Sequence, residues 1–167
     1  MEHPMSQILI IGYGNPDRED DGAAWHVLQK LADYYNTSVS TYDEIETAVW
    51  PAQTPHQLWT LQLTPEMAEL IAQYKLVCFV DAHTGYYQED LRVASIEAAY
   101  QLSPFTHHLT PQTCLALVHT LYGQTPQAVA ISVRGYRFGY GTELSDQTAA
   151  LVEQAVNHIT TWVSANI

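Results

Sequence analysis

Positive charge is scarce in this sequence, in which six lysines and arginines stand against 18 aspartates and glutamates and the formal net charge is −12. A surface of this sign repels the phosphates of nucleic acids and the headgroups of anionic lipids. We therefore expect neither a nucleic acid nor a membrane as partner. A cation, or a protein with a basic segment, suits this charge better.

Cysteine is also scarce, since the chain contains only Cys78 and Cys114. Cys78 lies within an apolar, strand-like run and Cys114 on the apolar stripe of a predicted helix, so we expect both thiols to be buried and inert. Nothing indicates a disulfide framework, and the residues after Met1 lack the basic and apolar regions of a signal peptide. No apolar run approaches the length of a membrane span. These absences favour the cytoplasm.

The 167 residues, of which 47% are hydrophobic, suffice for one domain with a sizeable core, and we treat residues 1–167 as a single domain. Apolar runs alternate with amphipathic segments along the chain. The pattern predicts an α/β fold: a three-layer sandwich in which a mainly parallel or mixed twisted sheet of about five strands has helices on both faces. The predicted strands are residues 7–11, 57–63, 76–80, 91–96 and 128–133.

Helix starts and stops are marked by local chemistry. Thr64 and Thr110 each precede a proline, which is typical of an N-cap followed by the first helical residue. Ser145 is expected to cap the last helix, and Gly123 to end the helix that begins after Thr110. Residues 36–55 contain two prolines and an acidic cluster, and we predict an irregular excursion with room for one short helical turn.

The chain is organised around residues 9–22, where an apolar strand runs into two glycines, a polar loop and an acidic pair. Gly12-Tyr13-Gly14 suggests a dinucleotide fingerprint, but Asp17 stands where the third glycine belongs, and carboxylates there would repel a pyrophosphate. We interpret Asp21 as the first ligand of a metal site. The alternative is that Asp20 and Asp21 only cap the following helix and stabilise its first turn.

Two further residues belong to the same edge of the predicted sheet. The apolar strand at 76–80 runs directly into Asp81, and His107 precedes the helix that begins at Thr110. Parallel strands would bring Asp21, Asp81 and His107 to one crevice. Two carboxylates and an imidazole suit a divalent transition metal and leave coordination positions for substrate or water. A strand-end aspartate can also be a turn former and a lone histidine purely structural, so spacing alone leaves these alternatives open.

Several segments in this order resemble the hydrogenase maturation proteases, which trim the C-terminus of the large subunit of nickel–iron hydrogenases. The resemblance spans nearly the whole chain. The matching segments are Gly12-Tyr13-Gly14-Asn15-Pro16 with Asp20-Asp21-Gly22, Gln62-Leu63-Thr64-Pro65-Glu66, Val80-Asp81-Ala82, Thr106-His107 followed by Leu109-Thr110-Pro111, and Gly135-Tyr136-Arg137-Phe138-Gly139-Tyr140-Gly141 with Leu144-Ser145.

The resemblance implies a twisted sheet sandwiched by helices and an endopeptidase acting on the large-subunit precursor after nickel insertion. It implies that Asp21, Asp81 and His107 are catalytic ligands of a nickel ion supplied by the substrate, a site that zinc or cadmium could occupy in a crystal. No serine, cysteine or threonine nucleophile is required. We expect a cytoplasmic monomer.

Neighbouring histidines and two other functions remain as alternatives. His108 competes with His107 for the ligand position. His83, two residues after Asp81 and on the same side of an extended strand, is either an extra ligand, a substrate contact or a solvated turn residue. The same cleft could also serve a non-catalytic nickel-binding chaperone, or a metal-dependent hydrolase or transferase of small molecules.

Overall fold

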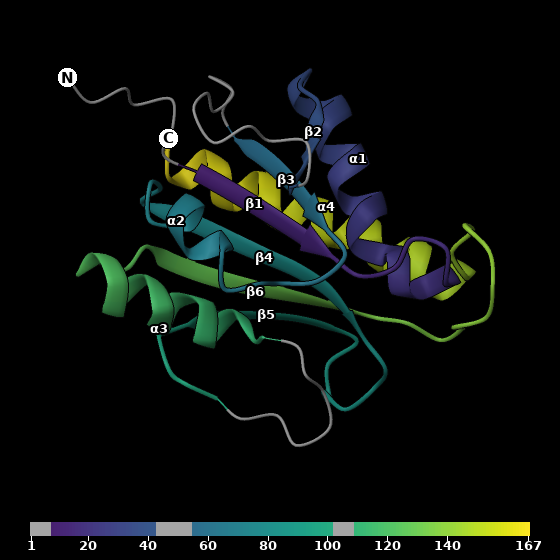
Figure 1. The fold of residues 1–167 in the computed structure, drawn as a ribbon. Helices are drawn as coiled ribbons and strands as arrows, with labels where there is room; N and C mark the ends of the chain where they lie inside the picture. The colour runs from purple at the N-terminus through teal and green to yellow at the C-terminus, as the bar shows by residue number, and fades with distance from the viewer. Residues whose placement is uncertain (1–7, 43–54, 102–108) are drawn as a thin grey trace.

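The computed structural model describes residues 8–42, 55–101 and 109–167, which form an α/β sandwich around one six-stranded sheet (Figure 1). The strands are β1 (Ile8–Tyr13), β2 (Val39–Thr41), β3 (His56–Thr60), β4 (Leu76–His83), β5 (Leu91–Ile96) and β6 (Gln127–Arg134). The helical elements are the 3₁₀ turn η2 (Glu19–Gly22), α1 (Ala23–Tyr35), α2 (Met67–Ile71), α3 (Pro111–Tyr122) and α4 (Asp146–Ala165). The prediction of about five strands missed β2, a three-residue edge strand within the segment expected to be irregular.

The order of the strands is β2-β3-β1-β4-β6-β5, and all neighbours are parallel except β5, which runs antiparallel to β6. The predicted mixed, mainly parallel sheet is therefore confirmed. Gly12 pairs with Val80, and Asp81 pairs with Ser132. Because β1, β4 and β6 are parallel, the segments that follow them leave from one edge of the sheet, which we call the carboxyl edge.

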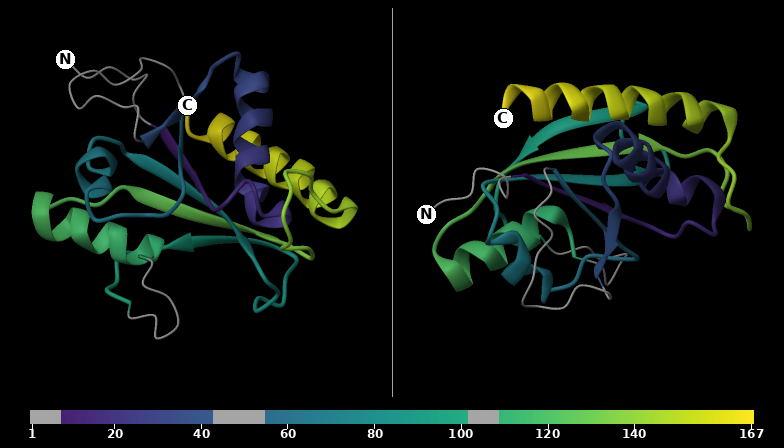
Figure 2. Two further views of the ribbon diagram at one scale, coloured as in Figure 1. Left: turned by 45° about the vertical axis from the view of Figure 1, so that its right-hand side comes forward. Right: turned by 90° about the horizontal axis from the view of Figure 1, so that it is seen from above.

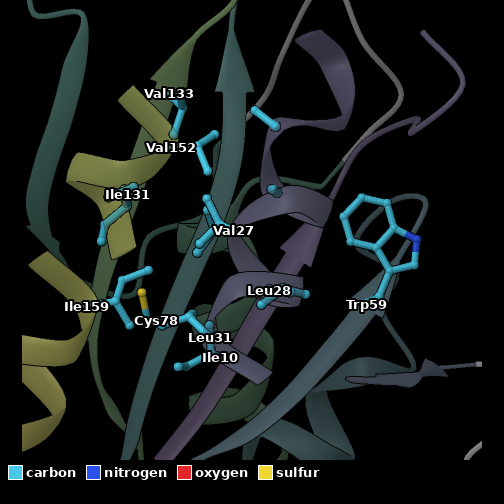
Figure 3. Packing of buried hydrophobic residues seen from close by; sticks show 14 of the residues in the cluster. Ile10, Val27, Leu28, Leu31, Trp59, Cys78, Ile131, Val133, Val152 and Ile159 are labelled. Carbon is cyan, nitrogen blue, oxygen red and sulfur yellow. The ribbon is translucent and has the colours of Figure 1, made fainter. Parts of the chain in front are cut away.

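Helices cover both faces, with α1 and α4 on one side and α2 and α3 on the other, as Figure 2 shows from above. Alternate residues of β1 serve the two cores: Ile10 packs with α1 and α4, whereas Leu9 and Ile11 pack with α2 and α3. Both faces of the central strands are thus buried, which explains their continuous apolar runs. The residues labelled in Figure 3 belong to the first core. Cys78 and Cys114 are buried in opposite cores, as predicted.

Gly12 allows α1 to approach β1 closely. A Cβ atom at this position would lie 2.8 Å from Cδ1 of Leu28, a fully buried residue of α1. A larger residue would therefore push the helix away from the strand. The first glycine of the motif thus serves helix–strand packing.

Three of the predicted helix signals are confirmed and one is wrong. Thr110 accepts a hydrogen bond from the backbone N–H of Thr113 at 3.1 Å, Gly123 ends α3 with φ of 76°, and Ser145 caps α4. The Thr64 hydroxyl, by contrast, is buried and has no hydrogen-bond partner within the described residues. Instead, the carbonyl of Thr64 accepts from the N–H of Met67 at 3.2 Å, so a backbone turn starts α2.

In the parts of the chain that the structure describes, no helix has both the length and the apolar character needed to cross a bilayer.

Candidate active site at the carboxyl edge

The loop after β1 folds back so that Asp21 returns to the strand end. Gly14 has φ of 139°, and a Cβ atom there would lie 2.3 Å from the carbonyl oxygen of Asp21. Only glycine tolerates both the backbone conformation and the contact. The N–H of Asn15 then donates to Oδ2 of Asp21 at 2.9 Å. One carboxylate oxygen is held by the loop, and Oδ1 accepts no hydrogen bond from any described residue.

Asp20 has a different role from its neighbour, and the alternative in which Asp20 and Asp21 cap the helix is wrong. Neither η2 nor α1 has a side-chain cap. The fully buried carboxylate of Asp20 instead accepts from the backbone N–H groups of Tyr136, Arg137 and Ser145 and from the hydroxyl of Ser145. Burial alone would raise the pKa of Asp20, but these hydrogen bonds lower it to about 2. The buried anion anchors η2 to the segment before α4.

Asp81 lies within β4, which extends to His83, rather than at the strand end as predicted. Ser132 of β6 donates to its Oδ1 at 2.7 Å, and the Tyr13 hydroxyl donates to Oδ2 at 3.3 Å. Burial raises the pKa of Asp81 to about 6, although the two hydrogen bonds oppose the shift, and the negative charge of Asp21 contributes to the rise. Two carboxylates that repel each other form a site that a bound cation would stabilise.

A pocket of about 400 Å³ opens beside Asp21, and Asp81 is not part of its lining. It is lined by Tyr13, Gly14, Asn15, Asp21, Leu61, Gln62, Leu63 and Leu109. Asp21 contributes the charge, and the leucines provide apolar walls. Leu109 lies two residues after His107 in the sequence, so the chain that follows the predicted third ligand reaches this pocket.

The structure places two of the three predicted ligands, Asp21 and Asp81, close enough for the charge of Asp21 to contribute to the raised pKa of Asp81. His107 and its competitor His108 lie outside the described residues. Within residues 8–42, 55–101 and 109–167, no three His, Cys, Asp or Glu side chains form a group that could hold a metal ion. The two carboxylates nevertheless fit a divalent cation, since their charges offset it and each keeps free lone pairs.

His83 is neither a solvated turn residue nor a free ligand. Only 3% of its surface is exposed, and its ring is held at both nitrogens. Nδ1 accepts from the N–H of Gly85 at 3.1 Å, and Nε2 donates to the carbonyl of Asp90 at 3.2 Å. The ring therefore fixes the turn between β4 and β5 and has no nitrogen left for a metal.

Sequence reasoning missed Tyr13 and Ser132, the two residues that hold Asp81. In the sequence, Tyr13 stands out only as part of the glycine motif, and Ser132 only as part of a predicted strand. Ser132 could be found only from the β4–β6 register, which pairs it with Asp81. No local pattern encodes this register, because it depends on which strands become neighbours.

A larger pocket, of about 670 Å³, lies at the opposite edge of the sheet, near Leu76, His119 and Trp162. Its lining contains one carboxylate, Glu97, just as the lining of the smaller pocket contains Asp21. Volume alone would favour this pocket as the functional site. The smaller pocket at the carboxyl edge is favoured because its carboxylate, Asp21, lies close enough to Asp81 to contribute to the raised pKa of that residue.

Solved structures share this architecture. The [NiFe] hydrogenase maturation protease HycI from Thermococcus kodakarensis KOD1 aligns with a TM-score of 0.65 at 21% identity, over 95% of this chain and 93% of that chain. The hydrogenase maturating endopeptidase HybD from E. coli aligns with a TM-score of 0.69 at 16% identity, over 95% and 93%.

The chain has the fold of the hydrogenase maturation proteases. HybD from Thermococcus kodakarensis, also a [NiFe] hydrogenase maturation protease, aligns with a TM-score of 0.62 at 18% identity, over 94% of this chain and 99% of that chain. Neither a protein-family model nor a curated protein matches the sequence. The fold predicted from the motif resemblance is thus confirmed by solved structures that share few residues with this chain.

Proposed function

We propose that this protein is an endopeptidase that removes the C-terminal extension of a nickel–iron hydrogenase large-subunit precursor after nickel insertion. The observation that carries the proposal is the pair of carboxylates, Asp21 and Asp81, on the carboxyl edge of a maturation-protease fold. The motif order in the sequence supports the same conclusion. His107 is the proposed third ligand.

In this mechanism the nickel ion belongs to the substrate, and binding it positions the scissile peptide bond. Asp21 binds through the oxygen that the N–H of Asn15 leaves free. Tyr13 and Ser132 hold Asp81 in a single orientation, and its remaining lone pairs would bind the ion. Held by these residues, the ion would polarise the scissile carbonyl or activate a water molecule, and this chemistry requires no covalent nucleophile.

The decisive experiment incubates the protein with nickel-loaded and nickel-free precursor and measures the mass of the large subunit. We expect shortening only of the nickel-loaded form, because the empty precursor lacks the ion that the acids bind. Asp21→Asn, Asp81→Asn and His107→Ala should abolish shortening with the fold retained. Asp17→Asn is the matched control, since Asp17 is an exposed acid of the same loop and its side chain makes no hydrogen bond or ion pair with the described residues.

The alternatives predict other outcomes. A nickel-dependent complex in which the subunit mass never changes would indicate a chaperone that only holds the precursor. Normal shortening by all three ligand variants would refute the proposed ligand set. In either case zinc or cadmium binding could be compared between wild type and the variants, because both ions accept carboxylate and imidazole ligands.

A further inference from the structure

An arginine lies on the same sheet face as the candidate ligands, two strands away from Asp81. Asp81 of β4 pairs with Ser132 of β6, and Ser132 pairs with Arg92 of β5. Paired residues point to the same face, and neighbouring strands lie about 4.8 Å apart. Arg92 is therefore anchored roughly 10 Å from Asp81 along the carboxyl edge.

The guanidinium of Arg92 is held by an aromatic ring. Its Cζ lies 4.2 Å from the centroid of the Tyr87 ring, and the Tyr87 ring packs edge-on against His83 at 5.1 Å. Because both nitrogens of His83 are hydrogen-bonded, the His83 ring is fixed and holds the Tyr87 ring in place. A stacked guanidinium keeps the N–H groups at its edge available and loses little conformational entropy on binding.

Arg92 has no carboxylate partner within ion-pair distance in the described part of the chain. Arg134, the other arginine on this face, differs in that respect. Its Nη1 forms an ion pair with Asp90 at 3.2 Å while its Cζ lies 4.9 Å from the Tyr136 ring. The two arginines share a stacked arrangement, but Arg134 is paired with a carboxylate, whereas Arg92 has no such partner among the described residues and can bind one from a ligand.

Exposed aromatic surface adjoins Arg92. Tyr86 is 78% exposed and packs against Tyr87 with ring centroids 5.5 Å apart. Tyrosine and arginine together are typical of the parts of a protein surface that bind other proteins. We call Tyr86, Tyr87 and Arg92 the arginine–tyrosine surface. This surface lies next to Asp81. The pKa of Tyr87 is raised mainly by the burial of its own hydroxyl and, second, by the negative charge of Asp81.

We propose that Arg92 binds a carboxylate side chain of the precursor polypeptide while Asp21 and Asp81 hold the nickel site. The inference rests on the proposed function and adds a substrate preference to it. An extended peptide advances about 3.3 Å per residue, so roughly 10 Å corresponds to an acidic residue about three positions from the nickel-bound part of the substrate. Arg92 offers this acid a local positive charge on a protein whose net charge of −12 otherwise repels it.

The test compares Arg92→Gln with Lys30→Gln in processing kinetics on nickel-loaded precursor. Lys30 is a surface residue of α1 paired with Glu153, so the control removes the same charge far from the edge. We expect KM to rise about tenfold in Arg92→Gln with kcat within twofold, and no change in the control. An unchanged KM in Arg92→Gln would overturn the inference.

Two further measurements distinguish substrate binding by Arg92 from a purely structural role of this residue: the dependence of affinity on salt, and the effect of changing an acidic residue of the precursor. Wild type should lose affinity steeply with ionic strength, whereas Arg92→Gln should show a shallower slope. Replacing the recognised acid of the precursor by its amide should raise KM for wild type but not for Arg92→Gln. A tenfold rise in KM with an unchanged salt slope would indicate that Arg92 only shapes the turn, against the inference.

The Kd of nickel-free precursor gives the same test without cleavage. Arg92→Gln should raise this Kd about tenfold and Lys30→Gln should not. If the wild-type protein does not cleave the precursor, but the Kd rises in Arg92→Gln as expected, the proposed peptidase activity is refuted and the role of the arginine–tyrosine surface is supported. If wild type cuts normally and neither Kd nor KM responds, the peptidase stands and the role of Arg92 is refuted.

Discussion

The hydroxyl of Ser145 donates to Oδ2 of the buried Asp20 at 2.6 Å, joining the turn before the first helix to the start of the last. The same carboxylate accepts three backbone N–H groups from residues 136, 137 and 145. The residue next to it in sequence, Asp21, points instead to the pocket. Adjacent acids thus have separate roles, one anchoring the loop and the other presented to a ligand.

Asp20→Asn should destabilise the protein by about 2–4 kcal/mol in urea unfolding at neutral pH. An amide replaces one acceptor oxygen by a donor that faces other donors, so at least one buried group loses its partner. Because the pKa of Asp20 is lowered to about 2, its contribution is present above about pH 4 and is lost as the pH falls toward 2. Asp33→Asn, at an exposed position of α1, is the control; an equal effect of the two would contradict this account.

Asp81→Asn should stabilise the metal-free protein at pH 7.5 by about 2 kcal/mol while abolishing processing. The folded state raises the pKa of Asp81 to about 6, so it favours the protonated acid, and ionisation costs stability as the pH rises from about 4 through 6. The gain in the variant should therefore shrink as the pH is lowered to 4. Thermal unfolding of both proteins across this pH range tests the prediction. A variant less stable than wild type at pH 7.5 would contradict the claim that ionised Asp81 destabilises the metal-free protein.

Tyr13→Phe should weaken binding of Ni²⁺ or Zn²⁺ about tenfold in calorimetry, because residues that orient a ligand contribute to metal affinity. Ser132→Ala should weaken it more, since its hydrogen bond to Asp81 is 2.7 Å long against 3.3 Å for Tyr13. Tyr140→Phe, at a residue that is 98% exposed, removes the same hydroxyl without contact to the site. Equal affinities in all four proteins would show that Asp81 needs no orienting partners.

His56→Gln should reduce the loss of stability between pH 6.5 and 4.5 by about 2 kcal/mol. His56 is buried, its Nδ1 lies 2.6 Å from the hydroxyl of Tyr74, and burial lowers its pKa to about 4. The neutral ring is favoured in the fold, so its stabilisation is full above about pH 6.5 and is lost as the pH falls toward 4. Parallel stability curves for wild type and variant would contradict this assignment.

The layers of the fold could be predicted because they follow from local patterns. Continuous apolar runs predicted buried parallel strands, and the caps at Thr110 and Ser145 located two helix starts. Thr64 shows the limit of this reasoning: its proline context matches that of Thr110, but its hydroxyl caps no helix and has no hydrogen-bond partner within the described residues. The short edge strand β2 was missed because three residues carry too little periodicity.

The sequence by itself determined the α/β class, the burial of both cysteines and the candidacy of Asp21 and Asp81, since each depends on residue type and spacing along the chain. Only the tertiary structure decided that Ser132 and Tyr13 hold Asp81 and that hydrogen bonds fix His83 within a turn. It also decided that Arg92 pairs with Ser132, which in turn pairs with Asp81. These contacts depend on strand order and register. Register arises from the packing of whole faces against helices, and no single segment specifies it.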